Sequence, residues 1–260
     1  MWLKENRGTD PMKAILIALA FLGLAGCFTI GDARKPIAFE TIAAPKPGAE
    51  RTALIILPGF GSDTQDMKKH GVAAAIQEVW PEVDVILADA TFAYYREGNL
   101  IDRLHDEVVA PTLRAGYRKV WLTGASLGGM GALLYEQQHP GEMAGIVLFA
   151  PFLGDRSLLQ EIDKAGGPRA WNPGELPAEV NSENYQRQVW KMIKGWTDAP
   201  QSAPRVWLAC GVEDGRMIAP ARLMAKALPQ DRFIELPGGH TWDAWINGGK
   251  TVFSRIRNAS

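Results

Sequence analysis

The chain alternates short apolar runs with longer amphipathic stretches. The runs are apolar on both faces and rich in Val, Ile and Leu, which is typical of strands in a parallel sheet that is covered on both sides. The strand-like runs are Ala53–Leu57, Val83–Leu87, Val120–Thr123, Gly145–Ala150, Val206–Cys210 and Phe233–Leu236, and the helix-like stretches are about 65–79, 98–115, 127–138 and 217–228. This alternation predicts an α/β fold with a mostly parallel, doubly wound sheet.

Two segments interrupt the alternation. Residues 28–50 contain Gly, Pro, Lys and Ala without sustained periodicity, which predicts a tether or an irregular edge. Residues 152–204 contain no strong strand candidate, and a structureless loop of that length is uncommon inside a compact domain. We therefore expect a mainly helical insertion, a lid or cap, within a single domain that spans residues 51–260.

The first 27 residues are typical of an export signal. Lys13 precedes an apolar stretch at 14–24, which is shorter than the roughly 20 residues that span a bilayer. Either Met1 or Met12 could be the true start, because residues 1–11 are polar and add nothing that a signal requires.

The end of this leader reads Leu24-Ala25-Gly26-Cys27, which resembles the lipobox of bacterial lipoproteins. The resemblance implies that Cys27 becomes the N-terminus and carries the lipid that anchors the protein to a membrane. Phe28 stands where an aspartate would, in that family, favour the inner membrane, so we expect the outer membrane. An ordinary cleaved signal, with a periplasmic or secreted protein, is the alternative.

Composition narrows the possible partners. The 28 Lys and Arg nearly balance the 29 Asp and Glu, whereas a nucleic-acid-binding protein usually has a basic excess. Two cysteines, Cys27 and Cys210, and four histidines give neither a disulfide framework nor a zinc-binding spacing. We therefore expect no nucleic acid, no metal and no cofactor, and the sequence leaves the oligomeric state open.

The strongest chemical motif is Gly124-Ala125-Ser126-Leu127-Gly128. It follows a strand-like run that ends at Thr123 and precedes a helix-like stretch, the context in which Gly-x-Ser-x-Gly forms a nucleophile elbow. The sharp turn exposes the serine hydroxyl, and the helix N-terminus favours negative charge beside it. Ser126 is therefore the candidate nucleophile.

From about residue 50 to the C-terminus the chain resembles the α/β-hydrolase superfamily, whose catalytic residues occur in the order Ser, acid, His. The resemblance implies that Asp214, after the run Val206–Cys210, is the acid, and that His240, after Phe233–Leu236, is the base. Glu213 is adjacent and is the alternative acid. Both loops should leave the sheet at the edge that carries Ser126.

The same resemblance implies an oxyanion hole made of backbone N–H groups. One donor is Leu127, and the other lies in Pro58-Gly59-Phe60-Gly61, where Pro58 replaces the usual histidine. We expect Phe60 to be this second donor, with Gly61 as the alternative. Among nearby aromatic residues, Tyr94, Phe152 and Trp242 are candidates for the substrate pocket, although packing is the commoner role of such residues.

These residues predict a serine hydrolase that cleaves carboxylic esters of short or medium acyl or aryl groups through an acyl-enzyme. The partner would be a small-molecule ester. The alternatives are an envelope acyltransferase, or a catalytically silent, membrane-tethered binding protein of the same fold.

Overall fold

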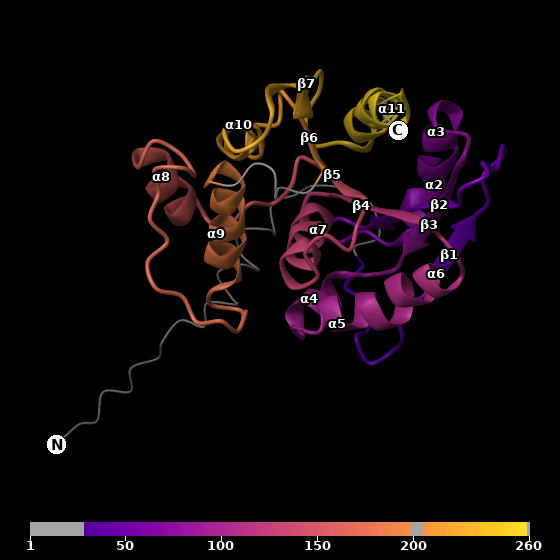
Figure 1. The fold of residues 1–260 in the computed structure, drawn as a ribbon, viewed down its shortest axis with the longest axis horizontal. Coiled ribbons are helices and arrows are strands. Elements are labelled where there is room, and N and C mark those ends of the chain that lie inside the picture. Colours follow the sequence, from indigo (N-terminus) through magenta and orange to yellow (C-terminus); the bar gives the residue numbers. More distant parts are fainter. Residues whose placement is uncertain (1–28, 199–204, 259–260) are drawn as a thin grey trace.

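A seven-stranded sheet forms the centre of the molecule in the computed structural model, which describes residues 29–198 and 205–258 (Figure 1). The strand order is β1-β3-β2-β4-β5-β6-β7, and only β1 is antiparallel to its neighbour. The strands are β1 (Phe39–Ile42), β2 (Thr52–Leu57), β3 (Val83–Ala88), β4 (Lys119–Ala125), β5 (Gly145–Phe149), β6 (Val206–Gly211) and β7 (Phe233–Leu236). All six predicted strands are confirmed, with ends that differ by at most two residues.

Helices cover both faces of the sheet, as the predicted doubly wound α/β fold requires (Figure 1). One face is covered by α4 (Phe92–Arg96), α5 (Leu100–Leu104), η1 (His105–Val109), α6 (Ala110–Arg114), α7 (Leu127–Gln138) and α10 (Ile218–Ala225), and the other by α2 (Thr64–Lys69), α3 (Val72–Val79) and α11 (Trp242–Asn258). Successive residues of one strand pack into opposite layers: Ile55 contacts the first group of helices, whereas Leu54 and Ile56 contact the second. This explains why the strands are apolar on both faces.

Two predicted helices are interrupted. The stretch 65–79 divides into α2 and α3 at Gly71, which has a φ of 66° and ends one helix before the next begins. The stretch 98–115 is continuous, but its central turn, η1, is π-helical. Such turns carry one extra residue and change the direction of the side chains that follow.

The prediction for residues 28–50 was wrong over Phe39–Ile42, which form the edge strand β1. Three of these four residues are exposed, so the strand lacks the apolar pattern by which the inner strands were recognised. Before it, the chain lies along the core: Ile37 is buried, and the Thr29 N–H donates to the Gly61 carbonyl at 2.9 Å.

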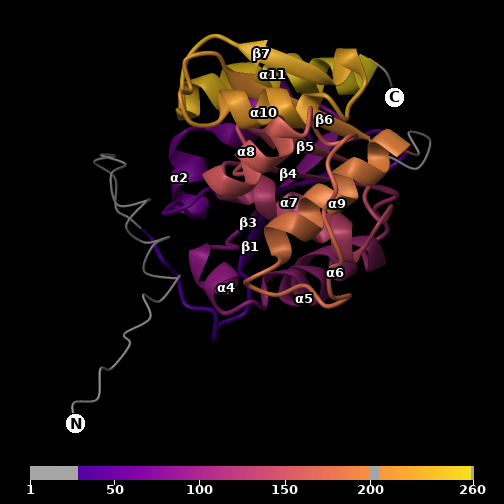
Figure 2. The same ribbon diagram turned by 90° about the vertical axis from the view of Figure 1, so that its left-hand side faces the viewer.

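The insertion at 152–204 is helical at α8 (Arg156–Lys164) and α9 (Tyr185–Asp198), and irregular over most of the residues between them. Both helices lie in front of the sheet when the molecule is viewed from their side (Figure 2). α9 packs on α7, and its Trp190 is fully buried and donates its indole N–H to the Leu153 carbonyl at 2.7 Å. The insertion therefore shares the main core.

The leader, with the predicted lipidation site at Cys27, lies outside the described residues. Within 29–198 and 205–258, none of the helices is long and apolar enough to cross a membrane.

Candidate active site

Ser126 lies in a strained turn between β4 and α7. Its φ of 55° and ψ of −116° are unusual for a residue with a side chain and cost on the order of 1–3 kcal/mol. Neighbouring backbone holds the turn in place, because the Ser126 N–H donates to the Phe149 carbonyl at 3.0 Å and its carbonyl accepts the Phe152 N–H at 2.9 Å. The chain thus fixes this side chain at the carboxyl end of the sheet.

Two glycines allow the elbow to form. A Cβ on Gly124 would lie 2.3 Å from the carbonyl carbon of Gly128, and a Cβ on Gly128 would lie 2.5 Å from the Leu57 oxygen. Both distances are far below van der Waals contact, and the obstructing atoms are backbone. Strand and helix therefore approach as closely as they do only because these two positions have no side chain.

His240 and Asp214 form a hydrogen-bonded pair beyond the ends of β6 and β7. The imidazole Nδ1 is 2.6 Å from Asp214 Oδ2, and the other carboxylate oxygen accepts the N–H groups of Arg216 at 3.2 Å and Met217 at 3.1 Å. Asp214 is 3% exposed. Both oxygens of the buried carboxylate are thus satisfied, and the ring is held in one orientation.

Opposing effects act on the pKa of Asp214. Burial alone raises it, but the hydrogen bond and charge of His240, together with the two backbone donors, outweigh burial and hold the pKa below its ordinary value of 3.8. The carboxylate is therefore charged at neutral pH, and it favours an imidazole that carries a proton on Nδ1.

Backbone contacts join the two loops that carry this pair. The Val212 N–H donates to the Leu236 carbonyl at 2.8 Å, and the Glu213 N–H donates to the Gly238 carbonyl at 3.0 Å. The Glu213 side chain is exposed, so the structure brings the carboxylate of Asp214, and not that of Glu213, to His240.

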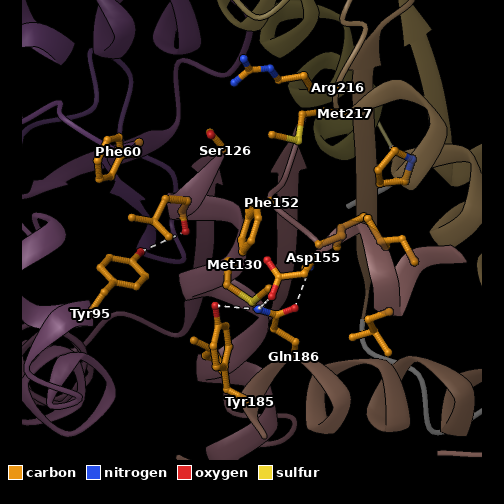
Figure 3. Close-up of a pocket in the computed structure, with 18 of the residues that line it drawn as sticks. Phe60, Tyr95, Ser126, Met130, Phe152, Asp155, Tyr185, Gln186, Arg216 and Met217 are labelled. Atoms are coloured by element: carbon orange, nitrogen blue, oxygen red, sulfur yellow. Dashed lines mark hydrogen bonds between the residues drawn. The ribbon is translucent and has the colours of Figure 1, made fainter. Parts of the chain in front are cut away.

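Ser126 and His240 line one cleft of about 3070 Å³. In the described part of the chain no hydrogen bond joins the Ser126 hydroxyl to the ring of His240, and catalytic hydrogen bonds often tighten only when substrate binds. The hydroxyl points into the space between Phe60 and Met217 (Figure 3). The nucleophile, the imidazole and a substrate can thus share this cleft.

The predicted oxyanion loop lies beside the elbow. A Cβ placed on Gly59 would be 3.7 Å from the Ser126 Cβ, and Phe60 lines the cleft with its ring edge-on to Phe92 at 4.8 Å. Leu127 is the first residue of α7, where backbone N–H groups have no acceptor within the helix. The first turn of α7 therefore offers backbone donors next to the nucleophile.

Two of the three predicted pocket residues, Phe152 and Trp242, line the cleft. Trp242 stacks on His70 at 4.8 Å and contacts Trp245 edge-on at 5.3 Å. Trp245 in turn contacts the His240 ring edge-on at 4.9 Å. The two tryptophans share one face of α11, as their spacing predicts, and together support the imidazole.

The structure does not place Tyr94 in the cleft. Its side chain is 3% exposed, its hydroxyl donates to the Lys35 carbonyl at 2.9 Å, and Arg103 lies over its ring. Successive helical residues point about 100° apart, so only one of the two tyrosines of α4 faces the cleft. That residue is Tyr95, whose hydroxyl donates to the Leu127 carbonyl at 3.1 Å (Figure 3).

Part of the cleft wall is formed by residues that the sequence motifs did not indicate. Met130, Tyr185 and Met217 line this part of the cleft, and the Gln186 side chain is hydrogen-bonded to Asp155 at its edge (Figure 3). Only Met217 had a sequence signal, since it closely follows Asp214. Met130 lies in α7, Tyr185 and Gln186 lie in α9, and Asp155 precedes α8, and the relative positions of these helices are a property of the tertiary structure.

Comparisons with known proteins agree with this arrangement. The family model described as "Putative esterase" matches residues 88–248. Among solved structures, Est1E from Butyrivibrio proteoclasticus has 16% identity and a TM-score of 0.57, over 85% of this chain and 92% of its own. S-formylglutathione hydrolase (FrmB) from Staphylococcus aureus has 13% identity and a TM-score of 0.59, over 87% and 99%. No curated protein matches this sequence.

Proposed function

The chain belongs to the esterase family, whose members hydrolyse esters on an α/β-hydrolase fold, and from this premise we propose that Ser126, His240 and Asp214 form its catalytic triad. One observation carries the proposal: the strained serine opens onto the same cleft as an imidazole that is held by a buried carboxylate. Asp214 would orient the ring and stabilise its protonated form.

The reaction would proceed through an acyl-enzyme. With Nδ1–H donated to Asp214, Nε2 of His240 takes the proton of the Ser126 hydroxyl as its oxygen attacks the ester carbonyl. The tetrahedral intermediate collapses, the C–O bond to the alcohol breaks, and His240 returns the proton to the departing alkoxide. Water then attacks the acyl-serine with the same base, which releases the acid and restores the hydroxyl.

Backbone N–H groups would stabilise the negative oxygen of the intermediate. Leu127 at the start of α7 and Phe60 in the loop after β2 are the proposed donors, and removing one such donor typically costs about 3–4 kcal/mol of transition-state stabilisation. The partial positive charge at the N-terminus of α7 also stabilises the negative oxygen of the intermediate.

We propose that the substrate is an ester with a short or medium acyl or aryl group. Ligand sites usually measure about 300–1,000 Å³, so a small ester would occupy only part of this cleft. Phe60, Phe152 and Met130 contribute apolar side chains to the walls of the cleft (Figure 3). An apolar acyl or aryl group fits such walls.

A fluorophosphonate probe tests the proposed function. We expect the folded wild-type protein to take up one equivalent, because the reagent traps a nucleophilic serine, and to hydrolyse chromogenic esters of graded chain length. Product analysis with added alcohol or sugar acceptors separates a hydrolase from an acyltransferase. A folded protein that takes up no label and cleaves no ester is a binding protein, and the proposal fails.

We also propose that Cys27 is lipidated and holds the protein on the bacterial outer membrane. The segment Leu24-Ala25-Gly26-Cys27, which resembles a lipobox at the end of a short apolar stretch, supports this proposal.

The Cys27→Ser variant tests this anchor. We expect it to lose all incorporation of labelled fatty acid and to leave the membrane fraction, because each buried methylene contributes about 0.8 kcal/mol to membrane binding. Cys210→Ser is the matched control, since this buried thiol belongs to β6 and should not affect labelling. Persistent labelling of Cys27→Ser would disprove the lipid site.

A further inference from the structure

A second group of potential ligands lies at the C-terminal end of α7. His105 begins the π-helical turn η1, His139 caps α7, and Glu142 follows three residues later. One ligand atom from each lies within 4.8 Å of the others. The helix separates this group from Ser126 by about 18 Å, at 1.5 Å per residue, and none of the three lines the cleft.

The distances are near those of a metal site. Glu142 Oε2 is 3.4 Å from His105 Nδ1 and 3.9 Å from His139 Nδ1. Ligands that bind Zn²⁺ tetrahedrally at 2.0–2.1 Å lie about 3.3 Å apart, so the widest separation in the group must shorten by up to about 1.5 Å. Each of the three side chains is about a quarter exposed, which lets an ion reach them from solvent.

A buried tyrosine already orients two of the ligands. The Tyr135 hydroxyl donates to Glu142 Oε2 at 2.5 Å and lies 2.9 Å from His105 Nδ1. Since its single proton goes to the carboxylate, the imidazole must donate to the phenol oxygen. This contact uses Nδ1 itself, so an ion that binds at Nδ1 replaces it, and the tyrosine holds the ring beside Glu142 only until the ion binds.

We propose that His105, His139 and Glu142 form a binding site for Zn²⁺ or a similar imidazole-preferring divalent metal. Two nitrogens and one carboxylate suit zinc, copper or nickel, whereas magnesium and calcium prefer oxygen ligands alone. The ion replaces the proton on His105 Nδ1, which is released to solvent. This site revises the expectation of no metal, which considered only residues close together in the sequence.

Binding requires one ring to move. The two imidazoles are stacked with centroids 4.3 Å apart and planes within 2° of parallel, and two parallel rings cannot both direct a nitrogen lone pair at one ion. His139 lies just beyond the last turn of α7, whereas His105 lies within a continuous helix, so His139 is the ring that tilts. The ion would then join η1 to the end of α7, two elements 34 residues apart.

Zinc titration of the full-length protein, stripped of metal and followed by competition with a chromogenic chelator, tests the site. We expect one ion per chain, at least tenfold weaker binding in His139→Gln and in Glu142→Gln, and no competition by Mg²⁺. His70→Gln removes one imidazole from outside the cluster and should bind zinc as tightly as wild type. Circular dichroism reports whether each variant is folded.

X-ray absorption of the zinc complex identifies the ligands. We expect nitrogen and oxygen at about 2.0–2.1 Å; sulfur at about 2.3 Å would instead assign the ion to a cysteine and overturn the proposal. Unchanged affinity in folded His139→Gln would also overturn it. So would loss of binding in His240→Gln, because the ion would then be bound in the cleft.

Discussion

Ser126→Ala is expected to lower kcat/KM for a chromogenic ester by about 10⁴- to 10⁶-fold and to abolish fluorophosphonate labelling. Alanine keeps the Cβ, so the strained backbone at φ 55° and its bonds to β5 are not altered. Only the attacking oxygen is lost. Steady-state kinetics and labelling measure the effect, and circular dichroism shows whether the fold is retained.

Two further variants complete this experiment. His240→Ala should lose activity to a similar extent, because members of a triad act as a unit. Ser157→Ala removes a hydroxyl from α8, elsewhere in the same cleft, and should behave like wild type. A residual rate near wild type in folded Ser126→Ala would refute the assignment of the nucleophile.

Asp214→Asn is expected to lower kcat by about 10⁴-fold, as loss of the orienting carboxylate does in other triads. The neutral amide cannot stabilise the imidazolium, and its NH₂ group favours the tautomer of His240 that has no proton on Nδ1. Glu213→Gln is the matched control, since that side chain is exposed and the ring is hydrogen-bonded to Asp214 instead. Equal losses in both variants would contradict the assignment of Asp214.

The lowered pKa of Asp214 also gives this pair a dependence on pH. The pKa of Asp214 is lower in the folded state than in the unfolded state, where it is about 3.9, so the charged carboxylate stabilises the fold. This stabilisation is fully present above the unfolded pKa and is lost as the pH falls through the folded pKa. The difference in unfolding free energy between wild type and Asp214→Asn should therefore shrink below about pH 4. Urea unfolding at pH 3 and pH 7 measures it, and a constant difference would contradict the account.

The inner sheet could be predicted from the sequence because burial on both faces leaves a continuous apolar run. β2 and β4 have this pattern, and their ends differ from the prediction by two residues or fewer. β1 could not be recognised in the same way, since it is held mainly by hydrogen bonds to β3 and its side chains are mostly exposed. Backbone hydrogen bonds do not require apolar side chains, so a strand held by them alone has no apolar pattern in the sequence.

The loops of the site were predictable because local rules fix them. The glycines around Ser126 are required by backbone contact, and the loops after β6 and β7 follow from the strand order. Tyr94 was placed in the cleft wrongly, because the sequence does not fix how a short helix is rotated about its axis. The pairing of His105 with His139 likewise depends on how η1 packs against α7.

The packing of α9 bears on how substrates reach Ser126. Trp190 is fully buried, and exposing one tryptophan of about 150–250 Å² at roughly 25 cal/mol per Å² costs about 4–6 kcal/mol. A swing of α9 away from α7 would also expose Ile193, so the swung-out form would make up less than about one molecule in a thousand. We therefore expect α9 to stay in place when a substrate enters the cleft.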